Sequence, residues 1–272
     1  MLGGFTLMSH LVFIKEVELD NAILLLGLEG YADAGGAASF TLSYLRRKLQ
    51  AESLAMISHV AMQDYTAYRP IALIEGGLVK AVHPPLSKIY YAKSSDRWVV
   101  LVQGPEPSFS WFQYIRYILD LASRVKASKI FTFGGFVDWV EAPKVSAVVS
   151  KEELKNMVLE AGIGLIDYEG PCSLYTVLIY ECASRGIDAI SLWYHVPFKD
   201  YAILKHINML DFRSTKMLLE KLKALTGIDV DLSDVDDDVK RLNETLTALS
   251  KKSAEARRFR AERREYGPSY II

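Results

Sequence analysis

Residues 21–28 read NAILLLGL, and this aliphatic run leads through the loop GYADAGG at residues 30–36 into a segment with helical spacing at residues 37–49. A strand that is buried on both faces of a parallel sheet has this composition, because neither of its faces meets water. We therefore predict a central buried strand, a tight turn and a helix, in that order.

The same alternation of apolar runs and helical segments repeats along the chain. Further strand-like runs lie at residues 54–61, 97–103, 129–133 and 189–195. Helical segments are predicted at residues 111–123, 151–161 and 174–184. Alternating strands and helices are typical of an α/β fold, so we predict a mostly parallel sheet with flanking helices, of the doubly wound or barrel-related kind.

The character of the sequence changes after Pro197. Residues 199–225 read as helix, and no strand signal follows residue 197. Gly267 and Pro268 would end the last helix. We therefore divide the chain into an α/β core domain at residues 1–197, a C-terminal helical extension at residues 198–266 and an apolar tail at residues 267–272.

The last predicted helix follows a run of six aspartates between residues 229 and 238, with Ser233 as its expected cap. Its apolar positions step by 4, 3, 4 and 3 residues, which is typical of a helix that packs along another helix. These positions are Val235, Val239, Leu242, Leu246 and Leu249. We expect this seam to face a helix of an oligomer or of a partner.

Composition excludes several classes of function. The 272 residues carry 32 Lys and Arg against 33 Asp and Glu, so no net field favours nucleic acid or anionic lipid. Residues 1–14, the longest stretch without charge, are shorter than the roughly 18–20 residues of a membrane span, and they lack the basic start of a signal peptide. With two cysteines and no disulfide framework, we expect a cytoplasmic protein without membrane or nucleic-acid partners. The basic stretch at residues 251–264 leaves nucleic-acid binding as a third hypothesis, which the preceding acidic run disfavours.

The loop at residues 30–36 lies where α/β folds place phosphate-binding turns. Gly30 and Gly35 have the spacing of a P-loop, but Gly36 and Ala37 replace its lysine and its serine or threonine. Asp33 would repel a phosphate, so we expect it to cap the following helix. Gly30, Asp33, Gly35 and Gly36 remain an alternative ligand loop.

Other candidates for chemistry stand near predicted strand ends. They are the carboxylates Asp64, Glu106, Asp138 and Glu169, and the thiol of Cys172. We interpret the carboxylates as surface groups and the cysteine as a packed residue, and we assign no catalytic residue. The five histidines show no metal-ligand spacing, so no metal or cofactor is expected.

Five segments resemble one known family. They are GYADAGGAA at residues 30–38, GPEP and Trp111 at 104–111, GGFVDWVEAP at 134–143, YEGPCSLY at 168–175 and GIDAISLWYHVP at 186–197. In order and spacing they are similar to the family named after proteasome assembly chaperone 2, over about residues 20–232. The resemblance implies a phosphorylase- or hydrolase-like α/β fold, homo-oligomers, and ATP-independent scaffolding of 20S proteasome assembly.

The resemblance also directs attention to the C-terminal tail. Some proteasome partners in and around this family end in a hydrophobic residue, a tyrosine and any residue, whereas Tyr270 here precedes Ile271 and Ile272. The shifted register speaks against an activator-like role. The tail can still bind a partner through its two isoleucines and the terminal carboxylate.

Our leading hypothesis is a cytoplasmic homo-oligomer that holds proteasome α-type subunits through aromatic surface, the last helix and the tail. The alternative is an enzyme related to nucleoside phosphorylases or hydrolases. It would use the loop at residues 30–36, with Asp138 or Glu169 as general acid or base.

Overall fold

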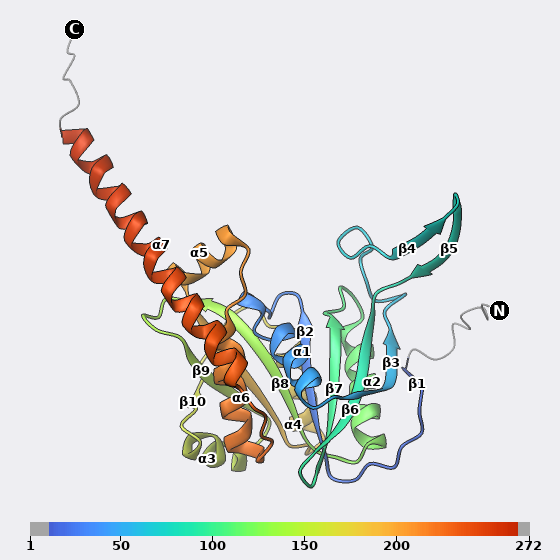
Figure 1. Cartoon of the computed structure of the whole chain (residues 1–272). Coiled ribbons are helices and arrows are strands. Elements are labelled where there is room, and N and C mark those ends of the chain that lie inside the picture. The colour runs from blue at the N-terminus through green and yellow to red at the C-terminus, as the bar shows by residue number, and fades with distance from the viewer. Residues whose placement is uncertain (1–10, 266–272) are drawn as a thin grey trace.

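The central strand of the structure is β2 (Ala22–Glu29), in the middle of a nine-stranded sheet (Figure 1). The computed structural model describes residues 11–265, with side chains of the last helix described up to Lys252 and at Glu255. In spatial order the strands are β1 (Leu11–Phe13), β3 (Glu52–Ser58), β6 (Leu86–Ser94), β7 (Arg97–Pro105), β2, β8 (Ala127–Asp138), β11 (Ala189–Pro197), β9 (Lys144–Val149) and β10 (Gly164–Leu165).

The four central strands β7, β2, β8 and β11 are parallel. Antiparallel strands extend both sides, through β6 next to β7 and β9 next to β11. The predicted α/β fold with flanking helices is confirmed, and its parallel part is the centre of the sheet. No helix among residues 11–265 is both long and apolar enough to cross a membrane.

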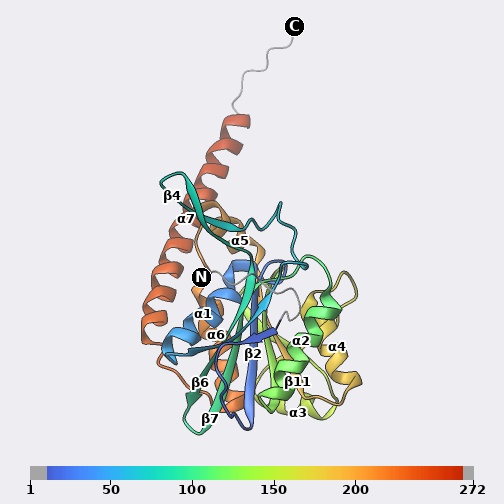
Figure 2. The same ribbon diagram turned by 90° about the vertical axis from the view of Figure 1, so that its right-hand side faces the viewer.

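Helices cover both faces of the sheet (Figure 2). They are α1 (Ser39–Lys48), α2 (Trp111–Arg124), α3 (Glu153–Glu160), α4 (Leu174–Ser184), α5 (Phe198–Ile207), α6 (Phe212–Thr226) and α7 (Ser233–Glu265), with a short 3-10 turn η1 (Ala34–Gly36) before α1. In β2, Ile23 and Leu25 face the core under α1 and α6, whereas Leu24 and Leu26 face the core under α2 and α4. Two buried faces explain why the strand is aliphatic at consecutive positions.

Two glycines let the first helix and its preceding turn lie close to the sheet. A Cβ atom on Gly27 would stand 2.5 Å from the carbonyl oxygen of Ala38, at the start of α1. A Cβ on Gly135 in β8 would stand 2.6 Å from Cβ of Ala37. Larger residues at either position would push α1 away from the sheet.

The structure contains strands that the sequence analysis did not predict. β6, β9 and β10 lie in the main sheet, while β4 (Ile71–Glu75) and β5 (Leu78–His83) form a separate hairpin. The hairpin turn is Gly76-Gly77, with φ of 57° and 78°. A Gly-Gly pair between two apolar runs is a hairpin signal, because both central residues of such turns need positive φ.

The single helix predicted at residues 199–225 is wrong, because the structure has two helices there. α5 ends at Asn208, whose left-handed conformation (φ 51°, ψ 49°) is typical of a helix end. α6 begins after Asp211, whose side chain accepts a hydrogen bond from the amide of Arg213. Asn208 and Asp211, two capping residues three positions apart, thus interrupt the helical pattern.

The seam of the last helix packs against helices of the same chain. Val235, Leu242 and Leu246 are buried in the core that contains Leu218 and Leu222 of α6. Val239 packs there partly buried, and Leu249 lies half-buried on the next turn. α7 then continues beyond the body of the molecule (Figure 1). The helices after Pro197 therefore share one core with the sheet.

The acidic run before and within α7 forms ion pairs with cations on neighbouring helices. Asp234 lies 3.0 Å from Lys48 of α1, and Asp229 lies 2.7 Å from Lys223 of α6. Ser233 is the first residue of α7 rather than the residue before it, and its amide and hydroxyl both donate to the Asp231 carboxylate.

A buried ion pair joins the helical extension to the sheet. Arg213 donates two hydrogen bonds of 2.7 Å to the carboxylate of Asp211 and one of 2.8 Å to Asp200. The Tyr194 hydroxyl of β11 also donates to Asp211, at 3.0 Å. The amide of Asp211 in turn donates to the carbonyl of Gly35. This network links the sheet, the loop after β2 and both helices that follow the sheet.

Replacing Arg213 with methionine should lower the free energy of unfolding by about 3–5 kcal/mol, because the carboxylate of Asp211 then stays buried without its cation. Urea unfolding followed by circular dichroism measures this loss. Arg241→Met is the control, since Arg241 pairs with Asp238 on the exposed side of α7, and its expected change is below about 0.5 kcal/mol. Equal losses in the two variants would contradict the prediction.

Candidate protein-interaction surface

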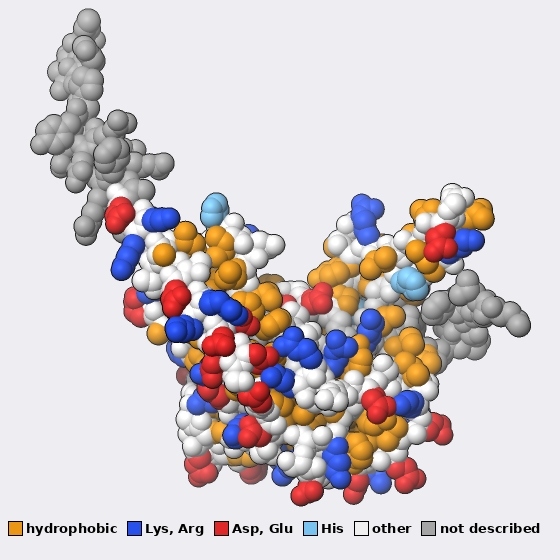
Figure 3. Space-filling view, in the orientation of Figure 1, with side chains coloured by type: hydrophobic (Ala, Val, Ile, Leu, Met, Phe, Trp, Pro, Cys, Tyr) orange, Lys and Arg blue, Asp and Glu red, His pale blue; other side chains and the backbone are white. Residues whose placement is uncertain are grey.

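Exposed aromatic side chains follow the carboxyl ends of the four parallel strands. We call this set the carboxyl rim, and it consists of Tyr31 after β2, Phe109 and Phe112 after β7, Trp139 after β8 and Phe198 after β11. In Figure 3 hydrophobic side chains flank a hollow at this end of the molecule, over α5 on one side and below the hairpin on the other. Large exposed aromatic groups are typical anchors of protein interfaces.

Residues 111–117 (WFQYIRY) place a stripe of four aromatic side chains on α2, and most of this stripe faces inward. Tyr114 is fully buried, and Trp111 and Tyr117 pack partly buried against the same core. Phe112 alone among these aromatic side chains is strongly exposed. The stripe therefore builds the core and contributes one residue to the rim.

The loop after β2 is held by its own aspartate. Asp33 accepts hydrogen bonds from the amides of Ala38 and Ser39, at 2.8 and 3.0 Å, and from the Ser39 hydroxyl at 2.6 Å. Burial raises the pKa of Asp33, while the bonds from Ser39 act in the opposite direction. The carboxylate thus occupies the amide groups that a phosphate would use at a helix start. Gly35 and Gly36 are covered by Asp211 and Leu210.

Glu106 connects two loops of the rim. One carboxylate oxygen accepts from the amide of Tyr31 at 3.1 Å, and the other accepts from the amide of Leu174, the first residue of α4, at 3.3 Å. The Glu106 amide donates to the Glu29 carbonyl at 2.7 Å. This carboxylate therefore fixes the position of Tyr31 relative to α4.

Trp139 and Phe198 form a stacked pair on the surface. Their ring centroids are 4.2 Å apart with an interplanar angle of 22°. Trp139 is 83% exposed and Phe198 is 47% exposed, so most of this aromatic area meets water. Two stacked rings held on the ends of neighbouring strands present a firm apolar surface to a partner.

A chain of hydrogen bonds supports this pair from below. Asp138 accepts from the amide of Trp139 at 2.7 Å and pairs with Nδ1 of His195 at 2.8 Å. His195 contacts the Ser146 hydroxyl through Nε2. Burial lowers the pKa of His195, against the raising effect of Asp138, and the bond from His195 lowers the pKa of Asp138. A neutral ring that donates from Nδ1 can accept the Ser146 proton at Nε2.

A second buried histidine lies under the loop that follows β3. His59 is fully buried, contacts the Ser87 hydroxyl at 2.9 Å through Nε2, and packs edge-on against Tyr114. Burial lowers its pKa to about 4. His59 is therefore uncharged at neutral pH.

The remaining predicted residues do not converge on one site. Asp64 accepts from the amide and hydroxyl of Thr66 in its own turn, and Glu169 and Cys172 are exposed. Tyr270, Ile271 and Ile272 lie outside the described residues. Among the side chains that the structure describes, at residues 11–252 and 255, no group of His, Cys, Asp or Glu is arranged to hold a metal ion.

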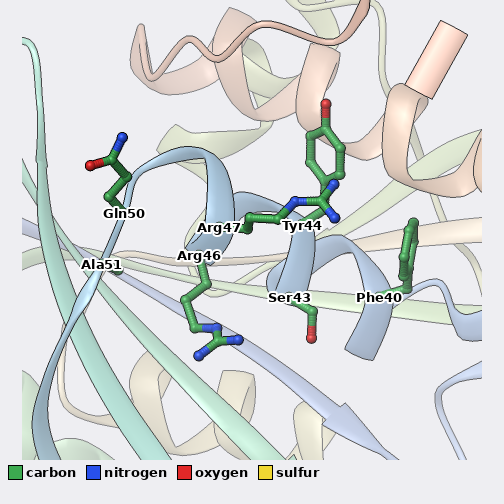
Figure 4. Close-up of a pocket in the computed structure, with 7 residues that line it drawn as sticks. All are labelled: Phe40, Ser43, Tyr44, Arg46, Arg47, Gln50 and Ala51. Carbon is green, nitrogen blue, oxygen red and sulfur yellow. The ribbon is translucent and has the colours of Figure 1, made fainter. Parts of the chain in front are cut away.

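A depression on the surface lies along α1, with a volume of about 480 Å³ (Figure 4). Its lining consists of Phe40, Ser43, Tyr44, Arg46, Arg47, Gln50 and Ala51. The Arg46 guanidinium stands 4.8 Å from the Tyr90 ring and that of Arg47 5.2 Å from the Tyr44 ring. Its side chains do not point toward a common centre in Figure 4. This depression contains neither Asp138 nor the loop at residues 30–36.

Sequence reasoning missed His195, Ser146 and the stacked partner of Trp139. His195 and Ser146 are 49 residues apart and meet only because β9 inserts antiparallel beside β11. Trp139 and Phe198 each directly follow the end of a strand, β8 and β11. An aromatic residue directly after a predicted strand was the feature of the sequence that could have indicated this exposed site.

The comparisons with known proteins agree with the α/β fold. The model of the PAC2 family matches residues 27–250. A PAC2 family protein from Streptomyces avermitilis has a TM-score of 0.73 at 24% identity, over 85% of this chain and 95% of that one. No curated protein matches the chain.

Two further solved structures have the same fold. A proteasome-assembly chaperone homologue from Mycobacterium tuberculosis has a TM-score of 0.73 at 23% identity, over 83% of this chain and 94% of that one. An archaeal proteasome activator from Pyrococcus furiosus has a TM-score of 0.67 at 21% identity, over 88% and 98% respectively. At such identities the likeness establishes the fold alone.

The buried His59 predicts a pH dependence of stability. Below pH 6.5 the unfolded chain binds a proton at His59, whereas the folded chain does so only near pH 4. The free energy of unfolding should therefore decrease as the pH is lowered from 6.5 towards 4. His59 contributes up to about 1.4 kcal/mol to this decrease for each pH unit. Urea unfolding of wild type and His59→Gln at pH 7, 6 and 5 tests this. The variant should show the shallower fall, and parallel curves would contradict the assignment.

Proposed function

The protein belongs to the PAC2 family, and from this premise we propose that it acts as a proteasome-assembly chaperone that binds other polypeptides without catalysing a reaction. The observation that carries the proposal is the carboxyl rim, whose aromatic groups are exposed at the ends of all four parallel strands. Relatives of the same fold include a proteasome-assembly chaperone homologue and a proteasome activator. Proteasome α-type subunits are the proposed partners, and the protein is proposed to act in the cytoplasm as a homo-oligomer.

The rim has the physical properties of a preorganised interface. Glu106 fixes the loop of Tyr31, and the chain from Ser146 to Asp138 fixes the backbone of Trp139. Side chains that are already ordered lose less entropy when a partner binds. A partner with an apolar pocket can therefore gain most of the energy of burying these rings.

Independence from ATP is part of the proposal. The loop after β2 has no lysine for phosphate, and Asp33 accepts from the amides at the start of α1. We further propose that Tyr270, Ile271 and Ile272 assist in holding the client. Truncation after Gly267 should then weaken capture in the assay described next.

Native mass spectrometry of the chain mixed with proteasome α-type subunits tests the proposal. We expect a complex without added nucleotide, and the double variant Trp139→Ala/Phe198→Ala should weaken it at least about tenfold, because anchors of this kind contribute more than about 1.4 kcal/mol. The control is Tyr180→Ala on α4, which is 71% exposed but lies outside the carboxyl rim.

Two results would count against the proposal. Failure to capture any α-type subunit or assembly intermediate would remove the chaperone function. Equal capture by the double variant and by the Tyr180→Ala control would leave the function but exclude the rim as its binding surface.

One observation favours a second, enzymatic function. Asp138, His195 and Ser146 are connected as in a serine hydrolase, with the carboxylate at Nδ1 and the hydroxyl at Nε2. Ser146 and His195 are each only 5% exposed, however, and Ser146 lies within strand β9 rather than on a loop. The same three residues also position Trp139, because Asp138 accepts a hydrogen bond from its amide and is itself held by His195 and Ser146.

A fluorophosphonate probe distinguishes these two roles. We expect no labelling of Ser146, because a buried hydroxyl cannot reach the probe's phosphorus atom. Peptide mass spectrometry locates any label. Labelling at Ser146 that disappears in His195→Ala would establish a reactive nucleophile and would support the enzymatic alternative.

A further inference from the structure

The hairpin of β4 and β5 projects from the body of the molecule and forms a sheet of its own (Figures 1 and 2). Every residue of β4 is exposed, and so is every residue of β5 except Ala81, which is half-buried. Six large apolar side chains of the hairpin are 47–73% exposed. They are Ile71, Leu73, Ile74, Leu78, Val79 and Val82.

The register of the hairpin creates one face whose paired positions are all apolar. Ala72 pairs with Val82, and Ile74 pairs with Val79. A bulge between Leu73 and Ile74 brings Val79 and Val82, three residues apart, onto the same face. The charges of the hairpin, Glu75 and Lys80, cancel.

Such a hairpin needs a cover to remain ordered. A two-stranded sheet without a third strand or a packed face is at best marginally stable in water. Its two outer edges also present unpaired amide and carbonyl groups, which makes an exposed apolar edge a site of association. Exposed apolar area on this scale therefore indicates an interface.

The apolar face of the hairpin needs a partner whenever the chain is folded, and this requirement indicates which partner covers it. A client that leaves after assembly would expose the apolar face each time, whereas a second copy of the chain is present whenever the chain is. The neutral, apolar composition also suits an interface between identical subunits, which is more apolar than a transient one. The carboxyl rim, by contrast, consists of aromatic groups that the body of the molecule already supports.

We propose that the apolar face of the hairpin docks on a second copy of this chain. This proposal rests on the homo-oligomer of the proposed function and names its interface. A standard interface uses about 20–30 residues per partner, so the 13 residues 71–83 supply roughly half of one. Val60 and Tyr65, in the segment that leads into β4, are also exposed.

The test compares the full-length chain with the double variant Ile74→Lys/Val79→Lys. Sedimentation velocity across a concentration series, with native mass spectrometry, measures the oligomeric state. The wild type should be oligomeric, and the variant should dissociate at concentrations at least about tenfold higher. Leu159→Lys is the control, because Leu159 is an equally exposed apolar residue on α3 (52%).

Unfolding of the variant would not explain its dissociation, because the hairpin residues belong to neither hydrophobic core, and circular dichroism spectra of variant and control at 25 °C should coincide. A benzophenone side chain introduced at position 79 should crosslink to a second copy of the chain. A monomeric wild type overturns the proposal, and so does an oligomer that the variant leaves intact. An intact oligomer that loses capture of α-type subunits would assign the hairpin to the client instead. Capture of α-type subunits is measured on the same samples. Failure of the hairpin proposal can therefore be told apart from failure of the chaperone function.

Discussion

Asp211 is a fully buried carboxylate at a junction of three parts of the structure, and the fold depends on how its charge is satisfied. Arg213 supplies two hydrogen bonds and Tyr194 a third, which together offset the cost of removing a charge from water. Because the Asp211 amide also binds Gly35, the same residue positions the loop after β2. The break between α5 and α6 is thus a structural joint, and it keeps α5 and Phe198 beside the end of β8.

The molecule has one exposed surface that its own hydrogen bonds hold and another that they do not. The carboxyl rim rests on hydrogen bonds that run through Glu106, Asp138 and His195 into the sheet. The hairpin has no comparable support, since its side chains are exposed on both faces. A surface whose side chains are already ordered by the fold loses little conformational entropy when it binds a partner. A surface that lacks such support needs its partner for its own stability.

The sequence predicted the parts of the fold that depend on short-range patterns. Buried strands such as β2 are visible as unbroken aliphatic runs, and the cap role of Asp33 followed from its place before a helix. β6 was missed because exposed lysines interrupt its apolar residues, and β4 and β5 because the Gly76-Gly77 signal went unused. The pairs Ser146–His195 and Tyr194–Asp211 could not be predicted, since they depend on which strands and helices become neighbours in space.

The carboxylates at the carboxyl edge of the sheet bind backbone amides, at the edge where many α/β folds place chemistry. A general acid or base must face a substrate, yet Asp33 and Glu106 both accept hydrogen bonds from backbone amides. Asp138 accepts from the amide of Trp139 and from His195. Each of these groups holds a loop, and the loops of Glu106 and Asp138 carry exposed aromatic residues. Polar groups at this edge therefore order the apolar groups beside them, as the proposed binding surface requires.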